Sequence, residues 1–225
     1  MNKKYNVLVT GSNRGIGKSI SNYYKIKGKN VIESNSKNLD LNKLEKLEEN
    51  FKNITKKNQI DILICSAGIN ENKSLNNFDL QSGSNLLNVN LISNIKLIQL
   101  VSKNMKKNNF GRIVLIGSLW SEFIRKDKLF YGISKSGLIS LGKSAALELS
   151  NNNILVNIVS PGFVNTEMTK KNLNKKQIES FKSQIPLGRF ADPNEIASIV
   201  YYLGSEDNTY VTGQNIFADG GWNIG

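Results

Sequence analysis

Short apolar runs along the chain alternate with longer segments in which apolar residues recur at every third or fourth position. The short runs predict buried strands at Tyr5–Thr10, Asn30–Ser34, Ile60–Cys65, Arg112–Gly117, Ile154–Ser160 and Gln214–Ala218. The longer segments predict helices at Ile16–Gly28, Leu44–Phe51, Leu86–Lys106, Tyr131–Ser150 and Asn194–Leu203. Strands and helices at this spacing form βαβ units, so we predict an α/β fold: a Rossmann-type doubly wound parallel sheet with helices on both faces.

Residues 163–190 interrupt this alternation with a long, polar, lysine-rich segment. It lies between a strand and the last helix, so we expect it to pass over one edge of the sheet as a substrate lid. Asn42 and Glu45 have the spacing of a capping box, which predicts the start of the second helix there. No repeat or low-complexity linker divides the chain, so residues 1–225 are expected to form a single domain.

Residue counts limit the possible chemistry. The 225 residues include one cysteine, Cys65, and no histidine. These counts exclude an intrachain disulfide, a multi-cysteine zinc site, His-ligated metal centres and hydrolases that use a catalytic histidine. We therefore expect no metal, and any catalysis must use Tyr, Lys, Ser, Asn or a carboxylate.

The net charge of +12 comes from lysines scattered along the chain, with few arginines and abundant asparagine. No basic stripe with interleaved aromatic residues occurs, so no nucleic-acid partner is expected. No apolar stretch approaches the length of about 18 residues that a membrane span needs. The first four residues lead directly into a predicted strand, which leaves no room for a signal peptide, and a cytoplasmic location is expected.

A glycine-rich loop follows the first predicted strand and leads into the first helix. Glycines allow a tight turn and a close approach of the backbone to a pyrophosphate, which the free N–H groups of a helix N-terminus can bind. This context favours a dinucleotide-binding loop over the alternative, a plain turn. The candidate cofactor-binding residues of the loop are Gly11, Ser12, Asn13, Arg14, Gly15, Ile16 and Gly17.

Tyr131 and Lys135 lie four residues apart, which places them on one face of a helix. An ammonium beside a phenol lowers the phenol's pKa, so this pair could exchange a proton with a substrate oxygen. Ser118, at the end of a predicted strand, could hold a carbonyl oxygen, and Asn90 could complete the set. The alternatives are a helix-surface pair for Tyr131 and Lys135 and a helix N-cap for Ser118.

Two further motifs, Pro161-Gly162 and Asp219-Gly220-Gly221, follow in the chain. In order and spacing, the whole set resembles the single-domain short-chain dehydrogenase/reductase family over essentially the full length: Thr10–Gly17, Asn90, Ser118, Tyr131-x3-Lys135 and these two motifs. The resemblance implies that Tyr131 is the catalytic acid/base and that Ser118 orients the substrate oxygen. It also implies that Lys135 holds the nicotinamide ribose and lowers the pKa of Tyr131, and that Asn90 supports a water beside Lys135.

Further cofactor contacts follow from the same resemblance. Besides Tyr131 and Lys135, it implies contacts at Asp40, Leu41, Ser66, Ala67, Gly68, Pro161, Gly162, Val164 and Thr166. The family's usual assembly implies a homotetramer, or a dimer, built on the helices predicted at Leu86–Lys106 and Tyr131–Ser150.

The chain departs from the family pattern at two places. Cys65 stands where the family has an asparagine that ties strands together, and we expect it to be a small buried apolar residue instead. The second departure is a deletion: Glu33–Lys37 leads almost at once to Asp40-Leu41, which predicts a vestigial third strand and a sheet shortened at that edge. Asp40 could also be the N-cap of the following helix.

The residues near the second strand bear on cofactor choice. An NAD enzyme uses a carboxylate at this strand end to bind the ribose 2′-hydroxyl, and Ser34–Lys37 contains none, although Glu33 is near. Arg14 lies where related enzymes hold a 2′-phosphate, so we expect NADP, with NAD as the alternative.

These observations predict an NADP-dependent oxidoreductase that interconverts a ketone and a secondary alcohol on a small polar or sugar-derived substrate. The alternative is a 3-oxoacyl-carrier-protein reductase, because Pro186-Leu187-Gly188-Arg189 and Asp192-Pro193-x-Glu195 resemble those enzymes. Asn108-Asn109 and Asn151–Asn153, however, stand where carrier-protein reductases tend to have arginines. An alternative of another class is a catalytically silent NADP-binding protein.

Overall fold

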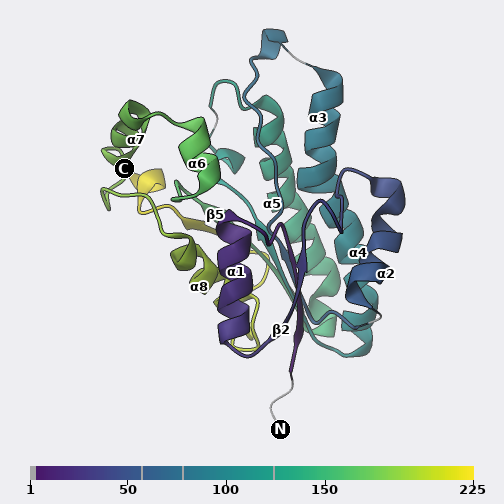
Figure 1. Ribbon diagram of the computed structural model, residues 1–225. Helices are drawn as coiled ribbons and strands as arrows, with labels where there is room; N and C mark the ends of the chain where they lie inside the picture. The colour runs from purple at the N-terminus through teal and green to yellow at the C-terminus, as the bar shows by residue number, and fades with distance from the viewer. Residues whose placement is uncertain (1–3, 57, 78, 124) are drawn as a thin grey trace.

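Parallel strands form the centre of the molecule (Figure 1). The computed structural model describes residues 4–56, 58–77, 79–123 and 125–225. In this part of the chain one six-stranded sheet has the order β2-β1-β3-β4-β5-β6, with every neighbouring pair parallel. The strands are β1 (Asn6–Thr10), β2 (Asn30–Ser34), β3 (Ile62–Cys65), β4 (Gly111–Ile116), β5 (Ile154–Pro161) and β6 (Asn215–Ala218). The predicted fold class is confirmed, and each predicted strand boundary lies within two residues of the observed one.

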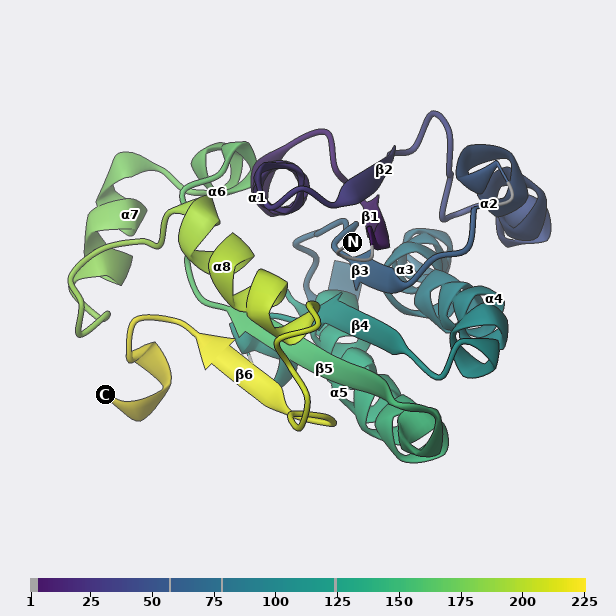
Figure 2. The same cartoon turned by 90° about the horizontal axis from the view of Figure 1, so that it is seen from below.

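Helices cover both faces of the sheet (Figure 2). On one face, α1 (Gly15–Ile26) packs against α8 (Pro193–Leu203), and on the other lie α2 (Leu47–Thr55), α4 (Ser93–Lys107) and α5 (Leu129–Leu149). The strands alternate between the two cores: Val7 and Val9 contribute to the α1/α8 side, and Leu8 to the opposite side. Because both faces are buried, the strands are apolar throughout, which is why short apolar runs marked them in the sequence.

The edge of the sheet at β2 is shortened, as the deletion predicts. Between β2 and β3, the described residues form no strand, and Leu39 and Leu41 are buried in a turn. The predicted capping box of Asn42 and Glu45 is wrong. The Asp40 carboxylate instead accepts the Asn42 N–H at 3.0 Å, and the helix begins with a 3₁₀ turn at Leu44–Lys46 that has no side-chain cap.

The helix predicted at Leu86–Lys106 begins earlier and is irregular. It consists of α3 (Leu80–Leu87), a π turn at Asn88–Ile92 and α4. The Asp79 side chain caps α3 by accepting the Gln81 N–H at 3.1 Å. The π turn carries Asn90, so this residue lies at a bulge rather than in a regular helix, where it would be less favourable.

The segment at residues 163–190 contains two short helices, α6 (Glu167–Asn172) and α7 (Lys175–Lys182), which lie beside the carboxyl ends of the strands (Figure 1). Phe163 stacks on Phe181 of α7 and on Phe190, with ring centroids 4.5 and 5.2 Å apart. Aromatic stacking therefore fixes α7 to the end of β5.

The motif Asp192-Pro193-x-Glu195 has a structural role. Asp192 and Glu195 form the capping box of α8, with Pro193 at its first position. Glu195 also pairs with Arg189, with one nitrogen–oxygen distance of 2.7 Å. This motif therefore fixes how α8 begins. No helix in the described part of the chain is long and apolar enough to cross a membrane.

Arg112 links the start of β4 to the C-terminal part of the chain. It is 2% exposed, and its guanidinium donates to the carbonyl oxygens of Ser205, Asn208, Gly111 and Asn153 at 2.8 to 3.2 Å. Burial lowers the pKa of this arginine. Its hydrogen bonds offset the cost of burying the charge.

Replacing Arg112 with methionine should lower the free energy of unfolding by about 3 kcal/mol, because buried carbonyl groups lose their donors. Urea unfolding measures the change. Arg189→Met is the matched control, since Arg189 and its partner Glu195 are both about half exposed and should contribute little. Equal destabilisation by the two substitutions would contradict this interpretation of Arg112.

Candidate active site

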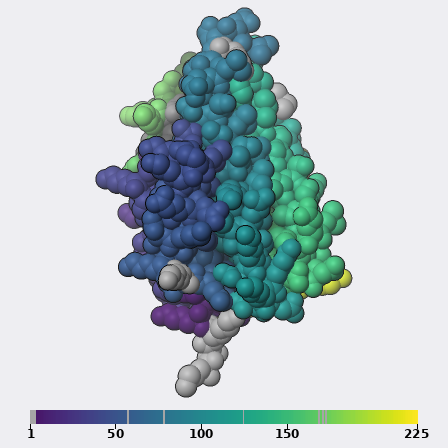
Figure 3. Space-filling view, turned by 90° about the vertical axis from the view of Figure 1, so that its right-hand side faces the viewer, coloured from purple at the N-terminus to yellow at the C-terminus, as the bar shows by residue number. Residues whose placement is uncertain are grey.

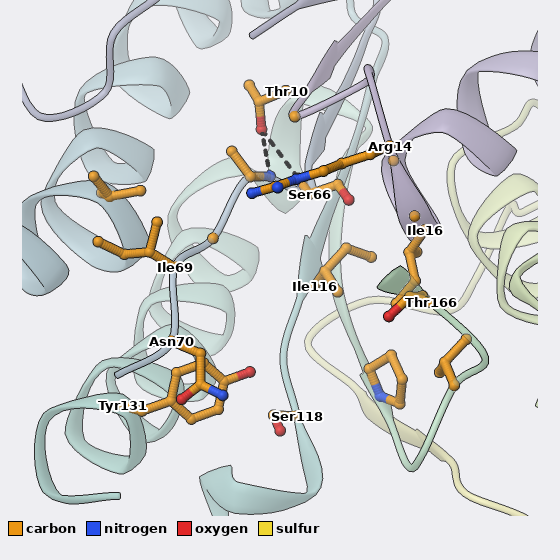
Figure 4. Close-up of a pocket in the computed structure, with 18 of the residues that line it drawn as sticks. Thr10, Arg14, Ile16, Ser66, Ile69, Asn70, Ile116, Ser118, Tyr131 and Thr166 are labelled. Carbon is orange, nitrogen blue, oxygen red and sulfur yellow. Dashed lines mark hydrogen bonds between the residues drawn. The ribbon is translucent and has the colours of Figure 1, made fainter. Parts of the chain in front are cut away.

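A cavity of about 630 Å³ opens at the carboxyl ends of the strands (Figure 4). The residues that end or follow β1, β3, β4 and β5 line it, as do the glycine loop and the start of α6. Ligands of open α/β sheets bind at this edge, because the strand ends and the helix N-termini meet there.

The glycine loop must come very close to its neighbours. Gly11 has a φ of +68°, and a Cβ atom there would lie 2.8 Å from the Cα of Ala67. A Cβ on Gly17 would lie 2.3 Å from the carbonyl oxygen of Gly11. Both positions therefore require glycine. The loop leaves the N-terminus of α1 facing the cavity, with no acidic residue in the first turn of the helix.

Thr10 connects the ends of β1 and β3. Its hydroxyl oxygen accepts the N–H groups of Ser66 and Ala67, each at 3.0 Å (dashed lines in Figure 4). Cys65 is 2% exposed in the apolar core, as expected, and burial raises the pKa of its thiol to about 12. The hydrogen bonds accepted by Thr10 therefore connect these strand ends, and Cys65 serves as an apolar core residue.

The lining of the cavity extends to the end of β2. Ser34, Asn35 and Ser36 line it there, and so do Asp40 and Leu41. These residues present hydroxyls, an amide and one carboxylate, which are groups that can hydrogen-bond the hydroxyls and base of a nucleoside.

The charges near the end of β2 are unevenly placed. Glu33 pairs with Lys25, with a nitrogen–oxygen distance of 2.8 Å, and it is absent from the cavity lining. Arg14 does line the cavity and is drawn among its residues in Figure 4. A cation therefore faces this end of the cavity, and the nearby Glu33 carboxylate does not.

Tyr131 of α5 and Ser118, just after β4, both line the cavity. Burial raises the pKa of Tyr131, and a hydrogen bond with Ser118 acts in the opposite direction. Ser118 also accepts the Trp120 N–H at 3.3 Å and so caps a 3₁₀ turn at Leu119–Ser121. The two interpretations of Ser118, as a site residue and as an N-cap, are therefore compatible.

Lys135 is buried one helical turn after Tyr131. Its ammonium donates to the carbonyl oxygen of Ile116 at 2.7 Å and lies 5.6 Å from the centre of the Tyr131 ring. Burial lowers the pKa of Lys135 to about 8. Burial is the largest influence on the pKa of Tyr131 and raises it, and the lowering of that pKa by the Lys135 ammonium stays a prediction.

Asn90 lies behind the cavity wall. Its amide exchanges two hydrogen bonds with the backbone of Ile69, both at 2.9 Å, and donates to the Ser134 hydroxyl at 3.1 Å. A Cβ on Gly68 would lie 3.5 Å from the Asn90 oxygen and 3.8 Å from the Lys135 nitrogen. Asn90 therefore fixes the segment that follows β3 and reaches the neighbourhood of Lys135.

Most of the residues predicted for the site line the cavity. Ser12 and Asn90 do not, and the Ser12 hydroxyl instead donates to the carbonyl oxygen of Ser34 at 3.1 Å. Sequence reasoning missed several lining residues with polar or aromatic side chains: Asn70, Trp120, Arg125 and Lys128. Lys128 stands three residues before Tyr131, and this spacing could have indicated from the sequence that the two side chains lie close together.

Comparisons with known proteins agree with this geometry. Residues 5–223 match the family described as enoyl-(acyl carrier protein) reductase. The 3-oxoacyl-(acyl-carrier-protein) reductase FabG of Buchnera aphidicola subsp. Schizaphis graminum is 39% identical over 238 residues, covering 97% of this chain and 97% of that protein. A solved 4-hydroxyisoleucine dehydrogenase complexed with NADH has a TM-score of 0.94 at 30% identity, covering 99% of this chain and 100% of that one. ElxO with NADP bound has a TM-score of 0.90 at 26% identity, covering 99% and 100%.

The chain belongs to the short-chain dehydrogenase/reductase family. It is an NAD(P)-dependent oxidoreductase that acts on a CH–OH group, and its substrates are small molecules. This excludes the catalytically silent protein that the sequence left open.

The buried Lys135 predicts a pH-dependent stability. Its pKa is about 8 when folded, against a reference value of 10.5, so the unfolded chain binds this proton more tightly between those values. Stability contributed by Lys135 therefore rises with pH in that window. The free energy of unfolding of Lys135→Met, relative to that of wild type, should be highest below pH 8. This difference should shrink by about 3 kcal/mol as the pH rises from 8 to 10.5.

Urea unfolding of the cofactor-free proteins at several pH values measures this difference. Lys143→Met, at an exposed position of the same helix, is the matched control. If the two variants show the same pH-dependent difference from wild type, the burial cost assigned to Lys135 is wrong.

Proposed function

We propose that this enzyme uses NADPH to reduce the ketone of a 3-oxoacyl compound to a secondary alcohol. The observation that carries the proposal is the convergence of Ser118, Tyr131 and Lys135 on one cavity, in a chain 39% identical to a 3-oxoacyl-(acyl-carrier-protein) reductase over 97% of its length. The curated relatives support this reading better than the small polar or sugar-derived substrate that the sequence favoured.

The proposed roles follow from the positions of the side chains. When bound, NADPH supplies the hydride that the carbonyl carbon accepts. The Ser118 hydroxyl donates a hydrogen bond to the ketone oxygen, and the Tyr131 hydroxyl transfers its proton to that oxygen as negative charge develops. Burial raises the pKa of Tyr131, which favours the protonated hydroxyl that this transfer requires.

Lys135 and the cavity wall complete the proposed site. We propose that the Lys135 ammonium binds the nicotinamide ribose, and that its charge then favours loss of the Tyr131 proton. Asn90 is proposed to act indirectly, by supporting a water beside Lys135 from its position behind Gly68. The backbone at Pro161, Gly162, Val164 and Thr166 also lines the cavity and is proposed to flank the nicotinamide.

A small polar or sugar-derived compound is the second candidate substrate. The 4-hydroxyisoleucine dehydrogenase superposes over 99% of this chain, and its name indicates a small polar substrate. In addition, Asn108 and Asn109 stand where carrier-protein reductases tend to have arginines. These observations favour the small polar or sugar-derived substrate predicted from the sequence, which is the second candidate after the acyl compound.

A homotetramer, or a dimer, built on α4 and α5 is also proposed. These helices lie together on one face of the molecule (Figure 3). Large apolar residues are exposed on α4, on α5 and on the π turn before α4: Ile92, Ile95, Ile133 and Leu147. Burial of these side chains against a second copy would stabilise the assembly. The cytoplasmic location stays a prediction.

The function is tested by incubating purified protein with NADPH and an acetoacetyl thioester and following the loss of absorbance of the reduced nicotinamide. Formation of the 3-hydroxyacyl product is expected. Protein that binds NADPH but produces no 3-hydroxyacyl compound would contradict the proposed substrate.

Arg14 predicts the choice of cofactor, because it is the cation that lines the end of the cavity near β2. NADPH should bind more tightly than NADH by at least about tenfold, and Arg14→Ala should weaken NADPH while leaving NADH nearly unchanged. Titration of protein fluorescence measures both affinities. Lys18→Ala, at an exposed position of α1 away from the cavity, is the control. Equal affinities for the two cofactors would contradict the assignment.

A further inference from the structure

Two cations that the proposed mechanism does not use line the cavity near Tyr131. Arg125 lies in the loop before α5, and Lys128 immediately precedes that helix. Both side chains are half-buried. Partial burial of a positive charge next to another positive charge is unfavourable unless an interaction with an acceptor or an anion compensates it.

Lys128 is fixed beside the reacting residues. Its ammonium lies 5.4 Å from the centre of the Tyr131 ring. It donates to the side-chain oxygens of Asn70, at 2.8 Å, and of Asn72. Asn70 lines the same part of the cavity as Tyr131, as Figure 4 shows. The acceptors of the Lys128 ammonium are neutral amides, so they orient the ammonium without cancelling its charge.

Arg125 is held by aromatic rings. Its guanidinium carbon lies 5.3 Å from the centre of the Trp120 ring and 4.8 Å from that of Phe181 in α7. These contacts with aromatic rings offset part of the cost of burying the guanidinium charge. Arg125 is also close enough to Lys128 that its charge adds to burial in lowering the pKa of Lys128 to about 8.

The other charged residues of the cavity do not neutralise this pair. Arg14 and Asp40 lie at the glycine-loop and β2 end, where the Asp40 carboxylate accepts the Asn42 N–H. Glu167 begins α6 next to Thr166, whose side chain contacts the Gly15 position of the glycine loop. Among the described residues, no ion pair joins a carboxylate to Arg125 or Lys128.

We propose that Arg125 and Lys128 bind a carboxylate carried by the substrate itself. The inference rests on the proposed ketone reduction and adds to it a preference for ketones that carry a free acid over uncharged ketones. A carboxylate in this position would accept two hydrogen bonds from the Arg125 guanidinium and one from Lys128, and it would relieve the repulsion between them. It would also place the ketone beside Ser118 and Tyr131.

Keto acids and their neutral esters test the proposal. The probes are acetoacetate and levulinate, each compared with its methyl ester, which keeps the ketone and removes the charge. For whichever of the two keto acids wild type reduces more efficiently, kcat/KM should exceed that of its methyl ester by at least about tenfold. Arg125→Gln and Lys128→Gln should each lower the acid-to-ester ratio of kcat/KM to less than about threefold.

Lys126→Gln is the matched control, because Lys126 lies in the same loop, is exposed and does not line the cavity. It should keep the preference for the acid. Thermal unfolding of each variant shows whether it is folded. Equal reduction of acid and ester by wild type, or an unchanged preference in both cavity variants, would overturn the proposal.

A binding measurement separates this proposal from the proposed reaction. Succinate, which has no ketone, should bind the NADPH complex of wild type, and Arg125→Gln should weaken it by at least about tenfold. Dimethyl succinate should not bind at the same concentration. Succinate binding without turnover of any ketone would contradict the proposed function alone. Turnover of the acetoacetyl thioester without succinate binding would overturn the carboxylate site alone.

Discussion

The active site depends on parallel strand pairing, which brings the carboxyl ends of β1, β3, β4 and β5 to one edge of the sheet. The Thr10 hydroxyl then sets the approach of two of these ends, since it accepts two backbone N–H groups that follow β3. Gly11 and Gly17 can close the loop only because no Cβ atom is present at either position. A change at any of these contacts would move the N-terminus of α1 relative to Tyr131 and Lys135.

Much of the fold could be predicted because strands buried on both faces are continuous apolar runs. The start of α3 at Leu80 could not. Leu80 is followed by Gln81, Ser82 and Gly83, which show no apolar periodicity. A Cβ at Gly83 would lie 2.2 Å from the Phe130 ring, and sequence does not reveal that tertiary contact. The Asn42 capping box failed for a local reason. The neighbouring Asp40 accepts the Asn42 N–H, and this turn replaces the cap.

The convergence of Ser118, Tyr131 and Lys135 followed from motif spacing, because that spacing places each residue at a strand end or on one helix face. The pKa shifts of Tyr131 and Lys135 could not be predicted from that spacing. Burial raises the pKa of Tyr131 and lowers that of Lys135, and the extent of burial is set by the packed structure. Arg125 and Lys128 gave little signal in a chain rich in scattered lysines, and only their position in the cavity distinguishes them.

We propose that the Tyr131 hydroxyl supplies the proton for ketone reduction, and Tyr131→Phe removes that hydroxyl alone. The ring can still pack against its neighbours, but the transferable proton is lost. NADPH affinity should stay within about twofold of wild type, while turnover of a ketone that wild type reduces should fall by at least about a hundredfold. If Tyr131→Phe keeps more than about a tenth of wild-type turnover, another group supplies the proton and the account is wrong.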